Sequence, residues 1–208
     1  YLPNGVSLLD IDLTELDTLP KENIIVTVGR LGTYEKNNSL LLNAIRNLPI
    51  ELVKNWEFLL IGPSTQEFSK EVALFKEKNP AIANCINMTG EINNRNTLYS
   101  YLRRAKIICM TSLSESTCIS TLEGMYFGTY PIITNYSDFT LDTTNNNKVG
   151  CIVENKNINA LVSSLKHIMS DDNLYCKGLE SQFYVRSVFD YGVLTKSLDS
   201  ILRRYIKG

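Results

Sequence analysis

Several features that would assign this chain to a common functional class are scarce or missing. Only one histidine, His167, occurs among 208 residues, and the charged residues nearly cancel to a formal net charge of -1. Because there is no basic block or stripe, nothing indicates a nucleic-acid surface or an attraction to an anionic membrane. No apolar run approaches the roughly 18 residues of a membrane span, and the sequence contains no signal peptide.

The cysteines and acids are not arranged as metal ligands. Five cysteines are spread along the chain without a C-x-x-C pair, which argues against a disulfide framework and a zinc site. His167 has no partner for acid–base work, and the acids Asp138, Asp142, Asp171 and Asp172 form no ligand cluster. We predict a reduced, cytoplasmic protein without a bound metal.

The chain begins at Tyr1 instead of a methionine, so we expect it to be a segment of a longer protein. It is long enough to bury one good core. Neither a linker rich in Pro, Gly or Ser nor an internal repeat divides it, which predicts a single domain over residues 1–208.

Short apolar runs alternate with amphipathic ones. The apolar runs, rich in β-branched residues, predict strands buried on both faces over residues 23–29, 57–62, 85–90, 106–112, 130–135 and 150–154. Apolar residues at three- and four-residue spacing predict helices over residues 37–48, 66–78, 95–105, 119–127 and 158–169. This alternation predicts an α/β fold: a Rossmann-like, doubly wound parallel sheet of about six strands with helices on both faces. Beyond residue 170 the pattern is helical only, and a helix over residues 189–206 is expected to pack along the domain edge or to reach a partner domain.

Ligands of such sheets bind beyond the carboxyl ends of the strands. Three of the five strand ends that we compared carry a glycine, namely Gly29, Gly62 and Gly90. Glycine lets the backbone turn sharply or approach a ligand closely, so these residues together mark one edge of the sheet as a crevice.

Two cations lie at this edge. Arg30 follows the first predicted strand, and Lys36 comes just before a predicted helix. A cation at a helix N-terminus opposes the helix dipole unless an anion lies between them, and a phosphate would be such an anion. The alternative is that both are solvated loop charges, with Lys36 paired to Glu35.

The stretch "TSLSESTCISTLEGM", residues 111–125, places Glu115 and Glu123 on either side of a change from a strand pattern to a helix pattern. Both glutamates follow a serine by three residues, as in a capping box. Helix capping is therefore the structural alternative to a ligand-binding role for these carboxylates.

Four segments occur in the order and spacing of a known family: "VGRLGTYEKNNSLLLNAIRNL", "FLLIGPS", "INMTGEI" and "TSLSESTCISTLEGMYFGTYPIITN". They resemble the C-terminal domain of GT-B glycosyltransferases, specifically the large retaining group called family 4 or group 1. The resemblance extends from "PNGVSL" at residues 3–8 to the terminal helix. Its most specific element is the E-x7-E spacing after a strand.

The resemblance implies a role for each matching residue. Arg30 and Lys36 would hold the diphosphate of a nucleotide-sugar, such as a UDP- or GDP-sugar, without any other cofactor. Glu115 would lie beside the donor sugar and its reacting C1, and Glu123 would accept hydrogen bonds from the ribose. The remaining positions would flank the base, line the crevice or present backbone N–H groups to the phosphates and sugar: Gly29, Gly62, Gly90, Glu91, Ile92, Ser116, Thr117, Cys118 and Ile119.

By the same resemblance, the chain would be the donor-binding half of a transferase in cell-surface polysaccharide or glycoconjugate synthesis. The acceptor would bind to an N-terminal domain that this chain lacks, so the isolated chain is expected to transfer nothing. In the full-length protein, peripheral contact with the inner face of a membrane is expected. The alternatives are a catalytically inactive GT-B module that binds or chaperones an active partner, and a GT-B epimerase or phosphorylase.

Two departures from the family pattern affect the expected site. "ESTCI" stands where the family usually has "EGFGL", and "KN" stands where it has "KG". The side chains at 116–118 are expected to narrow the sugar pocket or to alter its hydrogen bonding. Cys118, near a helix N-terminus, either has a lowered thiol pKa or fills space as a small apolar residue.

Overall fold

A parallel sheet organises the part of the chain that the computed structural model describes, residues 3–7 and 20–206. The segment "PNGVSL" is described only as far as Ser7, and Tyr1 lies outside the described residues. The strands are β1 (Glu22–Val28), β2 (Glu57–Ile61), β3 (Ile86–Gly90), β4 (Ala105–Met110), β5 (Tyr130–Thr134) and β6 (Cys151–Val153). All neighbouring strands are parallel, in the order β3-β2-β1-β4-β5-β6. The predicted Rossmann-like sheet is confirmed.

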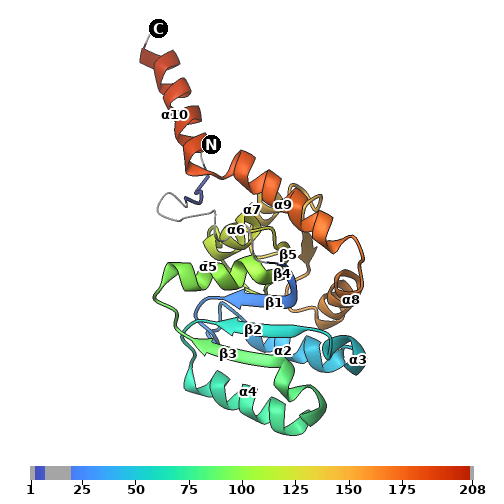
Figure 1. The fold of residues 1–208 in the computed structure, drawn as a ribbon. Coiled ribbons are helices and arrows are strands. Elements are labelled where there is room, and N and C mark those ends of the chain that lie inside the picture. The colour runs from blue at the N-terminus through green and yellow to red at the C-terminus, as the bar shows by residue number, and fades with distance from the viewer. Residues whose placement is uncertain (1–2, 8–19, 207–208) are drawn as a thin grey trace.

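Helices cover both faces of this sheet (Figure 1). Buried side chains of α2 (Asn38–Asn47), α4 (Gln66–Lys78) and α8 (Ile158–Met169) form one apolar cluster with the sheet. Those of α5 (Arg95–Arg104), α6 (Ile119–Tyr126) and α9 (Leu174–Val188) form the other. The remaining helices are α3 (Ile50–Val53), η1 (Pro80–Cys85, a 3₁₀ helix), α7 (Phe139–Thr143) and α10 (Tyr191–Ile206).

The composition of β1 explains why the predicted strands could be recognised. Ile25 packs into the cluster on one face, whereas Ile24 and Val26 pack into the cluster on the other. Successive side chains of a strand point to opposite faces, so a strand covered on both sides is apolar at every position.

The strand order determines where loops can meet. From β1 the chain proceeds outward to β2 and β3, then returns to place β4 on the other side of β1 and continues outward to β5 and β6. The order therefore reverses between β1 and β4, which is the topological switch point of a doubly wound sheet. The loops that follow β1 and β4 lie at the same edge of the sheet, beside one another.

Two of the predicted glycines, Gly29 and Gly62, allow close packing at this edge of the sheet. A Cβ atom on Gly62 would lie 2.0 Å from the carbonyl oxygen of Gly29, and a Cβ atom on Gly29 would lie 3.2 Å from Cε of Lys36. The glycines thus bring the ends of β1 and β2 together and let the Lys36 side chain lie over the end of β1. A Cβ atom on Gly90 would meet no atom within 4 Å.

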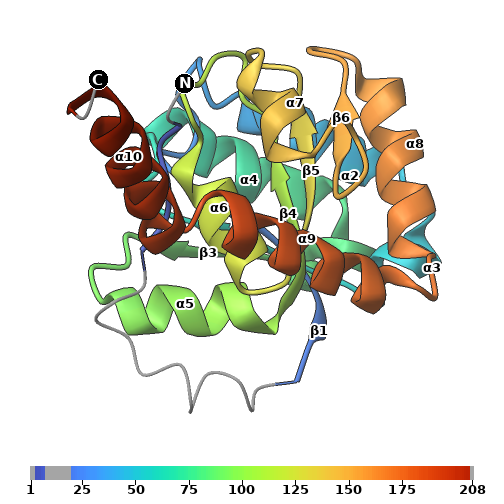
Figure 2. The same cartoon turned by 90° about the horizontal axis from the view of Figure 1, so that it is seen from above.

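The last helix extends away from the sheet (Figures 1 and 2). Val6 fixes its start, because the Val6 N–H donates to the Phe189 carbonyl at 2.8 Å and the Tyr191 N–H donates to the Val6 carbonyl at 3.0 Å. Several apolar side chains along α10 remain exposed, including Leu198, Ile201 and Leu202. In the described part of the chain, no helix combines the length and the apolar character needed to cross a membrane.

The contact between Gly62 and Gly29 leads to a test of stability. Gly62→Ala places a methyl group against a backbone oxygen and should lower the free energy of unfolding by about 3 kcal/mol or more. Gly90→Ala is the matched control, because Gly90 also has a positive φ, of 71° against 133° for Gly62, but faces open space. It should cost about 1 kcal/mol for its backbone conformation alone. Urea unfolding of both variants measures the difference, and equal losses would contradict the steric account.

Candidate functional site

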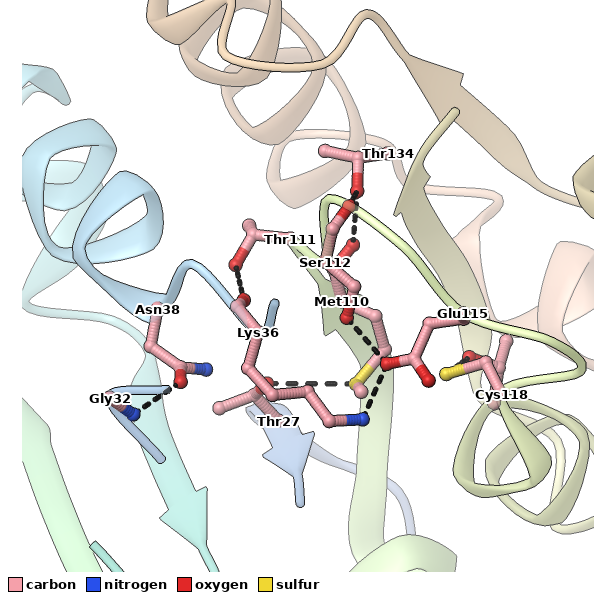
Figure 3. Close-up of polar contacts among 11 residues, drawn as sticks. Thr27, Gly32, Lys36, Asn38, Met110, Thr111, Ser112, Glu115, Cys118 and Thr134 are labelled. Atoms are coloured by element: carbon pink, nitrogen blue, oxygen red, sulfur yellow. Dashed lines mark hydrogen bonds and ion pairs between the residues drawn. The ribbon is translucent and has the colours of Figure 1, made fainter. Parts of the chain in front are cut away.

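Lys36 and Glu115 meet at the switch point. Lys36 comes from the loop between β1 and α2, and Glu115 from the loop between β4 and α6. The Lys36 ammonium donates to Oε1 of Glu115, and both side chains are only 15% exposed. Ser112 also donates its hydroxyl to this oxygen, at 2.7 Å. Figure 3 shows the pair between the two loops.

Further hydrogen bonds hold these two loops together. The backbone N–H of Leu113 donates to the Glu35 carbonyl at 2.7 Å. The Thr111 hydroxyl lies within hydrogen-bonding distance of the Lys36 and Asn37 carbonyls, at 3.2 and 3.0 Å. From β5, Thr134 donates to the Ser112 carbonyl at 2.5 Å. The ion pair is thus positioned by a network of backbone contacts.

These contacts contradict one of the two alternatives for Lys36. The sequence left open an ion pair with Glu35, but the partner of Lys36 is Glu115. Glu35 contributes its carbonyl to Leu113 instead. Arg30 is exposed at the end of β1. The interpretation of Lys36 as a solvated loop charge is therefore wrong.

The start of α6 presents backbone N–H groups next to Glu115. Cys118 is the N-cap residue, which agrees with the helix predicted to begin at Ile119, and no side chain caps the helix. Ile119 begins the helix, so its N–H has no intrahelical acceptor. The capping-box alternative is wrong for both glutamates: Glu115 precedes the N-cap residue by three positions, and Ser120 lies inside the helix.

The thiol of Cys118 does not have the properties of a reactive cysteine. Its side chain is buried in an apolar cluster and accepts a hydrogen bond from Thr121 at 3.1 Å. Burial raises the pKa of Cys118, chiefly by disfavouring the thiolate. The suggested lowering of this pKa is wrong, and the residue is the small apolar filler that the sequence offered as the alternative.

The other two residues of the altered loop differ in their exposure. Thr117 is buried and accepts a hydrogen bond from Asn4 at 3.0 Å, whereas Ser116 is exposed. Both line a hollow of about 520 Å³ beside α7, together with Asn4 and Asp138. Other hollows, of about 690 and 720 Å³, contain none of the predicted site residues.

Two of the three residues that replace a glycine of the family pattern retain a backbone suited to glycine, whereas the third, Ser116, has no positive φ. Asn37 stands in the "KN" pair with φ 47°, and Cys118 stands in "ESTCI" with φ 43°. Asparagine adopts this left-handed conformation more readily than most residues, whereas cysteine does so at some cost.

Glu123 bonds to a different part of the structure from Glu115. Its carboxylate is buried in α6, and Oε1 accepts from Arg95 at 2.6 Å and from Tyr99 at 3.4 Å, both in α5. Burial raises the pKa of Glu123, and Arg95 opposes this shift. The two glutamates therefore do not share one set of contacts, although both adjoin the start of α6.

Arg95 was not among the predicted site residues. It is the first residue of α5, where a cation opposes the helix dipole. Arg95 therefore carries the same sequence signal as Lys36, a cation at the start of a predicted helix. Glu91, in the segment before α5, is exposed, and Ile92 packs partly against an apolar cluster. In the described ranges, no three His, Cys, Asp or Glu side chains are grouped to hold a metal ion.

Comparison with known proteins gives consistent matches. Residues 13–180 match the family described as glycosyl transferases group 1. Over 153 residues the chain is 28% identical to the GalNAc-alpha-(1->4)-GalNAc-alpha-(1->3)-diNAcBac-PP-undecaprenol alpha-1,4-N-acetyl-D-galactosaminyltransferase of Campylobacter jejuni, covering 74% of this chain and 40% of that protein.

Solved structures share the fold. Sucrose-phosphate synthase from Thermosynechococcus elongatus has a TM-score of 0.78 at 21% identity, over 99% of this chain and 52% of that one. Anabaena HepE, solved with UDP and glucose, has a TM-score of 0.73 at 14% identity, over 88% of this chain and 49% of that one. The chain thus spans about half the length of these proteins, or less.

The left-handed conformation of Cys118 can be tested by substitution. Because a Cβ atom disfavours this conformation, Cys118→Gly should be more stable than Cys118→Ala by about 1 kcal/mol. Cys109, buried in β4 without a positive φ, provides the control pair, for which alanine should be the more stable replacement. Thermal and urea unfolding of the four variants gives the two differences. The same order at both sites would contradict a backbone cost at Cys118.

Proposed function

Because the chain belongs to the group 1 glycosyl transferases, we propose that it forms the donor-binding half of a retaining, nucleotide-sugar-dependent glycosyltransferase. One observation carries this proposal: Lys36 and Glu115 meet at the switch point, beside the uncapped start of α6. A cation and free N–H groups suit a diphosphate, and a carboxylate suits sugar hydroxyls.

In this proposal, Lys36 and Glu115 exchange each other for groups of the donor when it binds. Without a ligand, Lys36 and Glu115 neutralise each other. A diphosphate would take over Lys36, with Arg30 and the N–H of Ile119 contributing, and Glu115 would become free to accept from the sugar. When the nucleoside diphosphate departs, negative charge builds up on the β-phosphate, and the same donors would stabilise it electrostatically.

Two similar proteins suggest which donor and which acceptor the whole protein would use. HepE binds UDP and glucose, which supports a UDP-sugar as the donor here. The C. jejuni enzyme acts on a diphosphate-undecaprenol-linked glycan, which supports a lipid-linked acceptor and peripheral membrane contact of the whole protein.

The acceptor site would belong to a further domain. The exposed apolar side chains of α10, including Leu198 and Ile201, provide a surface against which such a domain could pack. We therefore expect the isolated chain to bind the donor nucleotide but to transfer no sugar.

Binding of a nucleoside diphosphate should stabilise the fold. With free ligand tenfold above its dissociation constant, the gain is about 1.4 kcal/mol, which raises Tm by roughly 3 to 6 °C for a chain of this size. Thermal unfolding with UDP, GDP and ADP measures the shift, and inorganic phosphate serves as the control. If millimolar amounts of these nucleotides leave Tm unchanged, the donor-site proposal fails.

Four substitutions separate phosphate, sugar and ribose recognition. Lys36→Ala and Arg30→Ala each remove a charged donor, so nucleoside diphosphate affinity should fall some 10- to 100-fold with little change for the bare nucleoside. Glu123→Gln should weaken binding of both ligands by a similar factor. Glu115→Gln should not reduce diphosphate affinity, because it releases Lys36, but should depress transfer by the full-length enzyme.

Calorimetric titration of each variant with nucleoside, monophosphate, diphosphate and nucleotide-sugar decides between these outcomes. Equal losses for all four ligands in the Lys36 variant would contradict its assignment to the phosphates. Unfolding curves of the free variants distinguish a lost contact from a damaged fold.

A further inference from the structure

Arg95 and Tyr99 both act on one oxygen of Glu123. Arg95 donates from Nη2 to Oε1 at 2.6 Å, and the Tyr99 hydroxyl approaches the same atom at 3.4 Å. No donor in the described part of the chain bonds to Oε2. The contacts therefore distinguish the two oxygens of this carboxylate: one is held by α5, and the other remains available to accept.

Arg95 lies where a cation destabilises the helix start, unless its ion pair with Glu123 offsets that cost. Asn94 caps α5, accepting from the N–H of Thr97 at 3.1 Å, and Arg95, which carries only donors, cannot accept from the other N–H groups of the helix start. A cation in the first turn opposes the helix dipole. The Arg95 side chain is 61% exposed, and its guanidinium carbon lies 5.1 Å from the centre of the Tyr99 ring, which fixes its direction.

The environment of Glu123 makes it depend on this partner. Its side chain is only 6% exposed, and leaving a buried carboxylate without a cation favours its protonated form. Among the described residues, the titratable groups that act on Glu123 are Arg95 and Tyr99, both from α5. Tyr99 is a neutral donor, since its own pKa is raised to about 12, chiefly by burial. Arg95 is thus the cation that offsets the burial of this carboxylate.

We propose that Arg95 is a positioning residue that keeps Glu123 ionised and oriented, so that Oε2 accepts from the two adjacent hydroxyls of a ribose. This inference rests on the proposed function, because it requires a nucleoside at the site. An ionised carboxylate oxygen has two acceptor positions, which match a vicinal diol. A 2′-deoxyribose offers only one of those hydroxyls, so the arrangement discriminates against it.

The pH dependence follows from the raised pKa of Glu123. As the pH falls through this pKa, the carboxylate gains a proton and loses acceptor capacity, so nucleoside affinity declines at the acidic end. Without Arg95 the pKa rises further, and the decline should begin at a higher pH. Inorganic diphosphate offers Glu123 no ribose hydroxyls, so the Arg95 substitution should not change the pH dependence of its binding.

The decisive variants are Arg95→Ala and Arg95→Lys, compared with Arg104→Ala. Arg104 is the last residue of α5 and pairs with Glu22 through two bonds of 2.7 and 2.8 Å, so its loss removes an equally close ion pair from the same helix at the other end. Arg95→Ala should reduce nucleoside affinity roughly 10-fold and reduce the preference for ribose over 2′-deoxyribose, whereas Arg95→Lys should restore part of both. Arg104→Ala should change neither.

Two measurements keep the inference separate from the proposed function. NMR titration of the Glu123 carboxyl carbon in the ligand-free chain should show a higher pKa in Arg95→Ala than in the wild type or Arg104→Ala. Calorimetry with UDP, its 2′-deoxy analogue and inorganic diphosphate, at acidic and neutral pH, should show the loss of ribose preference. An unchanged carboxyl titration, or an unchanged preference in a binding-competent Arg95→Ala, overturns the inference. Failure of the wild type to bind any nucleotide overturns the proposed function instead.

Discussion

The central constraint on this structure is the adjacency of β1 and β4 in the sheet. The helix after β1, α2, packs on one face, whereas the helix after β4, α6, packs on the other. The two connecting loops therefore leave the same edge of the sheet toward opposite faces, at the position where ligands of doubly wound sheets bind. The same adjacency brings together loops that are far apart in sequence, so Lys36 contacts a carboxylate 79 residues away. Both the glycine contacts at the strand ends and the bonds between the loops depend on this arrangement.

The sequence predicted most of the fold because the sheet is covered on both sides. The strands and the helices α2, α4, α5, α6, α8 and α10 were placed within a few residues, since their apolar periods are clear over the full element. The long helix α9 was predicted only as part of a helical region beyond residue 170, without bounds. The short elements α3, η1 and α7 were missed, because four to six residues contain too little of a period to identify a helix. The sequence also could not predict the partner of Lys36, which depends on how two loops pack. Arg95 was missed for a different reason: its signal was present at the start of α5, but its carboxylate partner lies in another helix.

The altered family motifs change side chains more than the backbone. Asn37, Ser116 and Cys118 replace glycines of the resembled pattern, and of these Asn37 and Cys118 retain the left-handed conformation that glycine adopts easily. Thr117 and Cys118 direct their bulk into the protein, so Ser116 is the residue of the altered loop that remains exposed. At Cys118 the loop therefore keeps the backbone that a glycine would adopt just before α6. This backbone is compatible with the donor-binding role proposed above.

The ion pair between Lys36 and Glu115 also restricts which small anions can compete for this site. Both charged groups are mostly buried, so removing the partner of one leaves the other poorly solvated. A free phosphate ion would satisfy Lys36 while leaving Glu115 without its cation and with the Ser112 hydroxyl as its remaining donor. A sugar attached to a diphosphate carries both the anion and the hydroxyl groups that replace the two lost contacts. In the proposed donor site, a diphosphate-linked sugar would therefore bind more tightly than inorganic phosphate, because it compensates both charges.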